Sequence, residues 1–119
     1  MKKITKKELK RLEQKKLQKD DREWSKKIRE VYPECIICGS KVRLNAHHII
    51  PREIKKTRHE LFNGVSLCPK HHKWGINSAH RNPLWFLLKL HEFSASKLEK
   101  CIDSLNHEET GEDNNGQSS

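Results

Sequence analysis

Residues 35–80 read CIICGSKVRLNAHHIIPREIKKTRHELFNGVSLCPKHHKWGINSAH, and the architecture of the chain depends on this stretch. Its 46 residues hold three of the four cysteines and six of the eight histidines of the whole chain. Thiolate and imidazole are the side chains that bind zinc most often in proteins. Such a density of them in one short segment indicates metal binding, with enough ligands for two sites.

The first predicted site follows from the spacing of two pairs. Cys35 and Cys38 form a Cys-x-x-Cys turn followed by Gly39, which permits the positive φ that such a turn often needs. A second pair with the same spacing starts at Cys68. One closed structural zinc site is therefore expected, with Cys35, Cys38, Cys68 and His71 as ligands. The neighbouring His72 is the alternative fourth ligand.

Composition limits the rest of the chain to a small domain. Of its 119 residues, 33% are hydrophobic and 34% are charged, so the core must be small and needs a staple such as a metal. The first residues, Met-Lys-Lys-Ile, are too polar for a secretory signal, and no transmembrane stretch is present. We therefore expect a reducing cytoplasmic location without membrane contact, where Cys-x-x-Cys favours zinc over a disulfide.

The net charge of +9 is distributed unevenly. Residues 1–31 have a balance of +7 and residues 32–107 of +6, whereas residues 108–119 carry four acidic residues and no basic one. A basic body favours a polyanionic partner, most simply nucleic acid, although charge alone also serves solubility.

Patterns along the chain predict an α+β fold with helices on both sides of the cysteine- and histidine-rich core. Thr5 and Glu8 have the spacing of a capping box and predict a basic helix ending before Pro33. Within it, Trp24, Ile28 and Val31 are expected to pack on the body. The lysine-rich first half is either a solvated arm or a DNA-facing one, and the sequence does not separate these two readings.

The core is expected to contain two paired strands and a helix. Residues 42–50 and 64–68 predict the strands, residues 51–62 a basic loop, and residues 69–77 a helix begun by Pro69. Another helix starts at Asn82-Pro83, and Ser96 with Glu99 predicts the start of a last one, in which Cys101 is a buried small residue. The expected organisation is a basic helix over 1–31, the core over 32–82, helices over 83–107 and a disordered acidic tail over 108–119.

The histidines outside the zinc tetrad divide into two groups. Successive side chains on a strand point to opposite faces, so His47 and His48 are not expected to bind one metal together. One would hold a metal while its neighbour transfers a proton, a task that suits a side chain with a pKa of about 6.5. A zinc ligand beside an ordinary surface histidine is the alternative.

The order Ala-His47-His48-Ile-Ile-Pro, Asn63, Cys68-Pro-Lys-His71-His72 resembles the HNH endonucleases of the ββα-metal fold. The resemblance implies that His48 is the general base that activates water and that Asn63 ties down the loop and helps to orient the base. It further implies a catalytic divalent ion, Mg²⁺ or another such as Mn²⁺ or Ni²⁺. The ligands of that ion would be His47 and His72. Versions with paired zinc half-knuckles are common among phage and mobile-element nucleases.

Two positions differ from the usual family pattern. His71 stands where most zinc-bearing members have a cysteine, which is an acceptable exchange of zinc ligands. Many members also have a further histidine one helical turn after the last motif histidine, whereas residues 73–76 are Lys, Trp, Gly and Ile. His80 would complete the ion's ligands if the helix unwinds at Gly75; otherwise water and phosphate fill the remaining positions.

The function that the resemblance implies is metal-dependent hydrolysis of DNA, leaving 5′-phosphate and 3′-hydroxyl ends. The expected DNA-binding residues are Arg52, Lys55, Lys56, Arg58 and Arg81. The expected setting is the cytoplasm of a bacterium or archaeon, or of a phage-infected host, with a phage or recombination protein left open as a further partner. The rival readings are a non-catalytic zinc module that binds DNA or protein and a degenerate HNH fold retained in recombination or packaging.

Overall fold

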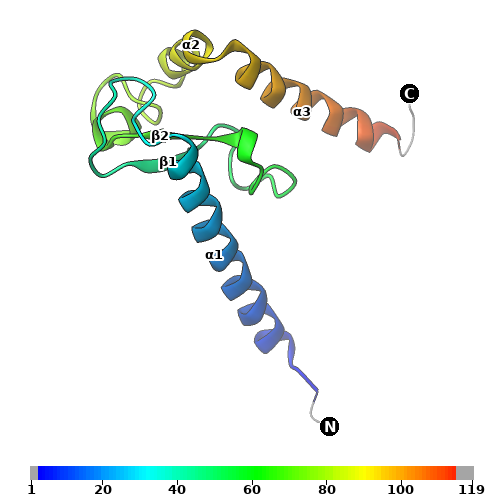
Figure 1. Ribbon diagram of the computed structural model, residues 1–119. Helices are drawn as coiled ribbons and strands as arrows, with labels where there is room; N and C mark the ends of the chain where they lie inside the picture. The colour runs from blue at the N-terminus through cyan, green and yellow to red at the C-terminus, as the bar shows by residue number, and fades with distance from the viewer. Residues whose placement is uncertain (1–2, 115–119) are drawn as a thin grey trace.

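The computed structural model describes residues 3–114, with the side chains of residues 3–106. The element order is α1 (Lys6–Val31), β1 (Asn45–His48), a 3₁₀ turn η1 (Leu61–Asn63), β2 (Gly64–Leu67), a short π-helix η2 (Lys70–Trp74), α2 (Pro83–Phe93) and α3 (Ala95–Asn114). A small sheet with η2 against it forms the centre. Helix α1 extends away from this centre on one side, and α2 and α3 lie on the other (Figure 1). The α+β class is therefore confirmed.

Helix α1 is long because its start is capped and its sequence contains no breaker. Thr5 Oγ1 accepts from the Glu8 amide and Glu8 accepts from the Thr5 amide, so the predicted capping box is present. Only the C-terminal end of α1 packs on the centre, where Trp24 and Ile28 are buried. Val31, expected to pack with them, is 57% exposed, since the chain turns away at Tyr32 before Pro33.

Strands β1 and β2 pair antiparallel, with His47 opposite Val65 and His48 opposite Gly64. Helix α1 crosses the face that carries Gly64. A Cβ on Gly64 would lie 2.5 Å from Trp24 Cζ2 and 2.7 Å from Ile28 Cδ1, so only glycine allows this approach. The sheet is thus covered by α1 on one face.

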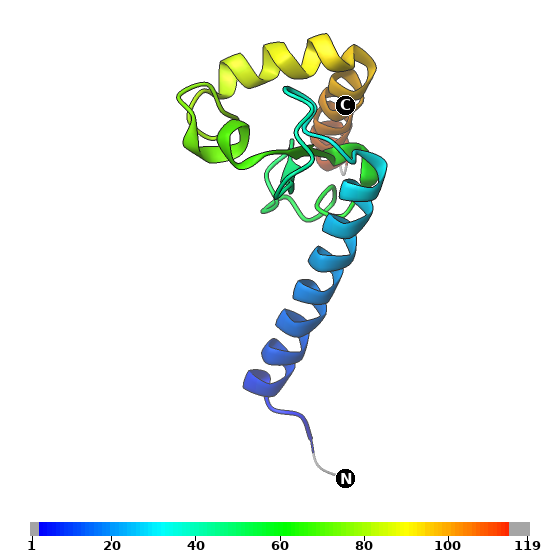
Figure 2. The same cartoon turned by 60° about the vertical axis from the view of Figure 1, so that its left-hand side comes forward.

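The other side of the molecule is closed by α2 and the loops that carry the cysteines. The buried cluster there consists of Cys35, Val65, Leu67, Cys68, Ala79, Phe86 and Leu90. Asn82 caps α2 by accepting from the Trp85 amide. Figure 2 shows α2 running across the top of the molecule and α3 turning downward from the end of α2. Cys101 on α3 is buried, as expected, and its thiol faces the Phe62 carbonyl at 3.6 Å.

Two predicted helices have different bounds in the structure. The helix expected over 69–77 is only η2, because the chain reverses after Trp74. The last helix begins at Ala95. The hydroxyl of Ser94, rather than that of Ser96, accepts a hydrogen bond from the backbone amide of Lys97 at 3.2 Å. The backbone of this helix continues to Asn114, into the segment expected to be disordered, as extending a formed helix costs little. Residues 115–119 lie outside the described residues.

Candidate metal centre

The Cys35–Ser40 turn brings the first two thiols together. The Cys35 amide donates to the Ser40 carbonyl at 2.8 Å and the Gly39 amide donates to the Cys35 carbonyl at 2.9 Å. Gly39 has φ 78°, the left-handed conformation that the sequence predicted for it. The turn is therefore tight enough to present Cys35 and Cys38 on one side.

The four predicted zinc ligands form one cluster. Ligand atoms of Cys35, Cys38, Cys68 and His71 all lie within 4.8 Å of one another. The sulfurs of Cys38 and Cys68 are 3.7 Å apart, and His71 Nδ1 lies 3.3 Å from Cys68 Sγ and 3.9 Å from Cys35 Sγ. Tetrahedral zinc with its usual bond lengths places two sulfurs about 3.8 Å apart and sulfur and nitrogen about 3.6 Å apart. The cluster is compatible with a zinc site.

The surroundings of these thiols also favour a metal. Burial raises the pKa of the Cys35 thiol, but hydrogen bonds from the amides of Cys68, Cys38 and Ile37 lower it by more, so that the pKa is lowered overall. Burial and the neighbouring thiols raise the pKa of Cys38. Because a metal ligand must be a thiolate, a cluster of partly buried thiols with amide donors requires a cation to be stable in its deprotonated form.

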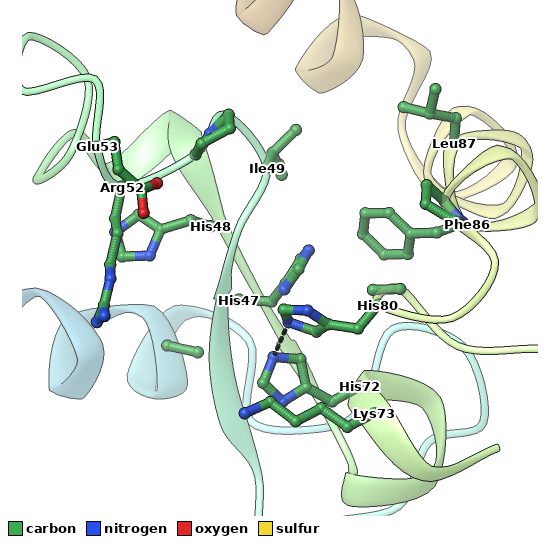
Figure 3. Close-up of a pocket in the computed structure, with 14 residues that line it drawn as sticks. His47, His48, Ile49, Arg52, Glu53, His72, Lys73, His80, Phe86 and Leu87 are labelled. Carbon is green, nitrogen blue, oxygen red and sulfur yellow. Dashed lines mark hydrogen bonds between the residues drawn. The ribbon is translucent and has the colours of Figure 1, made fainter.

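Three histidines form a second cluster. His47, His72 and His80 offer ring nitrogens within 4.8 Å of one another, and Nε2 of His72 lies 3.1 Å from Nε2 of His80. Figure 3 shows these rings converging from β1, η2 and the loop before α2. Two ligands at right angles around an ion with bonds of about 2.1 Å would be about 3.0 Å apart.

His80 reaches this cluster because the chain reverses after η2. The amides of Ala79 and His80 donate to the carbonyls of His71 and His72, at 2.8 and 3.1 Å. Gly75 stands at the reversal, where a Cβ would lie 2.9 Å from the Lys70 carbonyl oxygen. The unwinding at Gly75 that the sequence required for His80 is therefore present.

Burial keeps the histidines of this cluster neutral, and a hydrogen bond orients one of them, His72. Burial, with the nearby His72 and His80, lowers the pKa of His47 to about 3. Burial, then His80 and Lys73, lowers the pKa of His72 to about 4. His72 Nδ1 donates to Asn45 Oδ1 at 3.2 Å, so its Nε2 lone pair faces the cluster. Neutral imidazoles with a fixed tautomer are the form in which histidine binds metals.

His48 lies on the other face of β1, close to Arg52 and Glu53 (Figure 3). Its Nε2 is 2.9 Å from the Arg58 carbonyl oxygen. Because a carbonyl only accepts, Nε2 carries the proton and Nδ1 is free to take one. Burial lowers the pKa of His48, so the ring is neutral at pH 7.

A cavity of about 650 Å³ connects His48 with the histidine cluster. Its lining includes His47, His48, His72 and His80, the charged Arg52, Glu53 and Lys73, and the apolar Phe86 and Leu87. The strand alternation that separates His47 from His48 thus leaves both facing one solvent-accessible space.

Asn63 is fully buried and fixes the loop after β1. Its Oδ1 accepts from the Ile50 amide at 2.6 Å, and its Nδ2 donates to the carbonyls of Ile50 and Thr57, each at 3.1 Å. Thr57 immediately precedes Arg58, whose carbonyl binds His48. Asn63 is therefore bonded to the residue next to the one whose carbonyl contacts His48.

The residues expected to bind DNA have different surroundings. Arg52, Lys55, Lys56 and Arg81 are exposed, and Arg81 donates to the Trp74 carbonyl. Arg58 is different: its side chain is 13% exposed and forms a two-pronged ion pair with Asp21 at 2.9 and 2.6 Å. The Arg58 guanidinium is thus bound within the protein.

Sequence reasoning missed Asp21, Asn45 and Phe86. Asp21 lies three residues before Trp24 on α1 and pairs with Arg58 and His59. Its position on the helix face that carries Trp24 and Ile28 is a signal the sequence does contain, because an acidic residue in an apolar stripe needs a buried partner. Asn45 and Phe86 gave no such signal.

Residues 35–74 match the model of a family described as HNH endonuclease. The match includes Cys35 with Cys38 and Cys68 with His71, both strands, Asn63 and His72, and it ends before His80. It confirms the resemblance found in the sequence and supports a nuclease-type function. Neither the search of curated proteins nor that of solved structures found a match. Within the described residues, no helix is long and apolar enough to cross a membrane.

Proposed function

We propose, on the premise that residues 35–74 form an HNH endonuclease domain, that this chain hydrolyses DNA phosphodiester bonds with a divalent ion and a histidine base. The products would carry 5′-phosphate and 3′-hydroxyl ends. The observation that carries the proposal is one cavity that holds a neutral, oriented His48 beside three converging histidines. This combines a proton acceptor with a site for a cation.

The ion's ligands would be His47, His72 and His80. When bound, the ion would neutralise charge on the scissile phosphate and on the leaving oxygen. Three neutral imidazoles leave it open positions for phosphate and water, unlike the closed Cys35, Cys38, Cys68 and His71 set, which we assign to structural zinc. Mg²⁺, Mn²⁺ and Ni²⁺ are the candidates for the open site.

His48 would accept the proton of the attacking water at Nδ1. The carbonyl oxygen of Arg58, 2.9 Å from Nε2 of His48, accepts the Nε2 proton in a hydrogen bond and would stabilise the imidazolium that forms. Asn63 would keep that carbonyl in place through its bonds to residues 50 and 57. Each role thus belongs to a side chain with a fixed hydrogen-bond partner.

Exposed Arg52, Lys55, Lys56 and Arg81, with the basic α1, would neutralise phosphates flanking the cavity. Binding that depends on such contacts weakens steeply with salt. We exclude Arg58 from this set because Asp21 neutralises it.

The test is plasmid nicking with Mg²⁺, Mn²⁺ or Ni²⁺ and an EDTA control. His48→Ala should lower the rate by about 10²–10⁴-fold with DNA binding retained. His91→Ala, which removes an exposed histidine of α2, is the matched control and should cleave at the wild-type rate. Full activity of His48→Ala would refute the assigned base. A wild-type protein that binds DNA but cleaves none would favour the non-catalytic zinc module instead.

A further inference from the structure

Helix α1 lies outside the matched segment, yet it contacts the histidine assigned as the base. The rings of Trp24 and His48 are stacked, with centroids 3.9 Å apart and planes 9° apart. Trp24 is 4% exposed, and its Nε1 donates to the Glu60 carbonyl at 2.9 Å. The indole is therefore itself held in one orientation.

A second residue of α1 acts on the same histidine from another direction. Asp21 accepts from Nε and Nη2 of Arg58, at 2.9 and 2.6 Å, and from His59 at 2.7 Å. The carbonyl of that same Arg58 accepts the Nε2 proton of His48. Asp21 and Trp24 lie one turn apart on the same face of α1. Trp24 limits the plane of the His48 ring by stacking on it, and Asp21 limits rotation within that plane through Arg58.

We propose that Trp24 and Asp21 are positioning residues for His48, so that α1 is part of the nuclease apparatus and not only a basic arm. The inference rests on the proposed function. A histidine on a two-stranded sheet is otherwise free to turn about two side-chain bonds, and small misplacements of a catalytic group are costly to rate. Helix α1 removes that freedom before substrate arrives.

The kinetic test compares three variants of the full chain. Trp24→Leu keeps apolar volume but loses the flat ring, and should lower kcat for nicking at least about tenfold with KM for DNA changed less than about twofold. Trp24→Phe keeps a flat ring and should restore most of kcat. Ile28→Ala removes packing of α1 over Gly64 one turn later and should leave kcat near the wild-type value.

Wild-type kcat in Trp24→Leu, or a Trp24→Phe as slow as Trp24→Leu, would overturn the inference while the proposed function stands. An equal loss of kcat in Ile28→Ala would also overturn it, because docking of α1 alone would then explain the effect. Zinc content and circular dichroism of each variant establish that the fold is retained.

The ring of His48 provides a readout that needs neither cleavage nor a folded Trp24→Leu. In the zinc-loaded protein at mildly alkaline pH, ¹⁵N resonances should show the His48 proton on Nε2. Asp21→Asn weakens the hold on Arg58 and should produce a mixture of tautomers, whereas Trp24→Phe should not. A mixture already present in the wild type would overturn the inference. A wild type with the Nε2 proton fixed but no nicking would instead overturn the proposed function.

Discussion

Replacing Asn63 with alanine should destabilise the protein and slow cleavage together. The side chain is fully buried and makes three hydrogen bonds, at 2.6, 3.1 and 3.1 Å. At about 1 kcal/mol net for each bond, the loss is about 3 kcal/mol, a large share of the stability of a small domain. The backbone groups of Ile50 and Thr57 then lose their partner, so the loop that places the Arg58 carbonyl should loosen and kcat should fall.

Urea unfolding measures the loss of stability. It is done at saturating zinc, so that metal binding contributes the same free energy to the stability of both proteins. With a slope of about 1–3 kcal/mol/M, the midpoint should fall by about 1 M or more. Asn77→Ala, at an exposed asparagine, should shift it by less than about 0.5 kcal/mol. An Asn63→Ala protein destabilised by less than about 1 kcal/mol at unchanged slope would refute the hydrogen-bond argument.

Three further predictions concern the metals and pH. Cys35→Ser should lose tightly held zinc and unfold, as shown by metal analysis and circular dichroism; a folded, zinc-free variant would contradict the tetrad. Because the pKa values of His47 and His72 are lowered to about 3 and about 4, a divalent ion binding there at pH 7 should release almost no protons. Calorimetry in buffers of different ionisation heat measures this, and release of one proton per ion would refute it. The Arg58 guanidinium lowers the pKa of Asp21 to about 2 from 3.8, so its ion pair stabilises the fold above pH 3.8 and is lost as pH falls toward 2. With Asp21 28% exposed, the gap in stability between wild type and Asp21→Asn should shrink by about 1–2 kcal/mol over that range, and a constant gap would contradict the assignment.

Residue type and spacing predicted the cluster of Cys35, Cys38, Cys68 and His71, whereas the grouping of His47 with His72 was expected from the resemblance to HNH endonucleases, with His80 left open. Cys35 and Cys38 need only a local turn, and the φ of Gly39 confirms that turn. The capping box of Thr5 and Glu8 is equally local and was equally predictable. Local rules also located both strands, though the structure shortens them to four residues each.

The remaining features depend on contacts between residues distant in sequence. The helix predicted over 69–77 ends early, at Trp74, because the amides of Ala79 and His80 donate back to carbonyls of η2, a pairing that helix propensity does not contain. Arg58 looked like a phosphate ligand until the fold placed it against Asp21, 37 residues earlier. The charge of a side chain is readable from sequence, but its partner is not.

His71 and His72 are neighbours on one short turn, and each faces a different cluster. Any movement that draws the His71 ring from its thiols therefore displaces the ring beside it. If each cluster holds its proposed ion, occupancy of the two sites would be linked: an ion at the cysteines would fix His72 for the second ion, and by thermodynamic reciprocity the second ion would strengthen binding of the first.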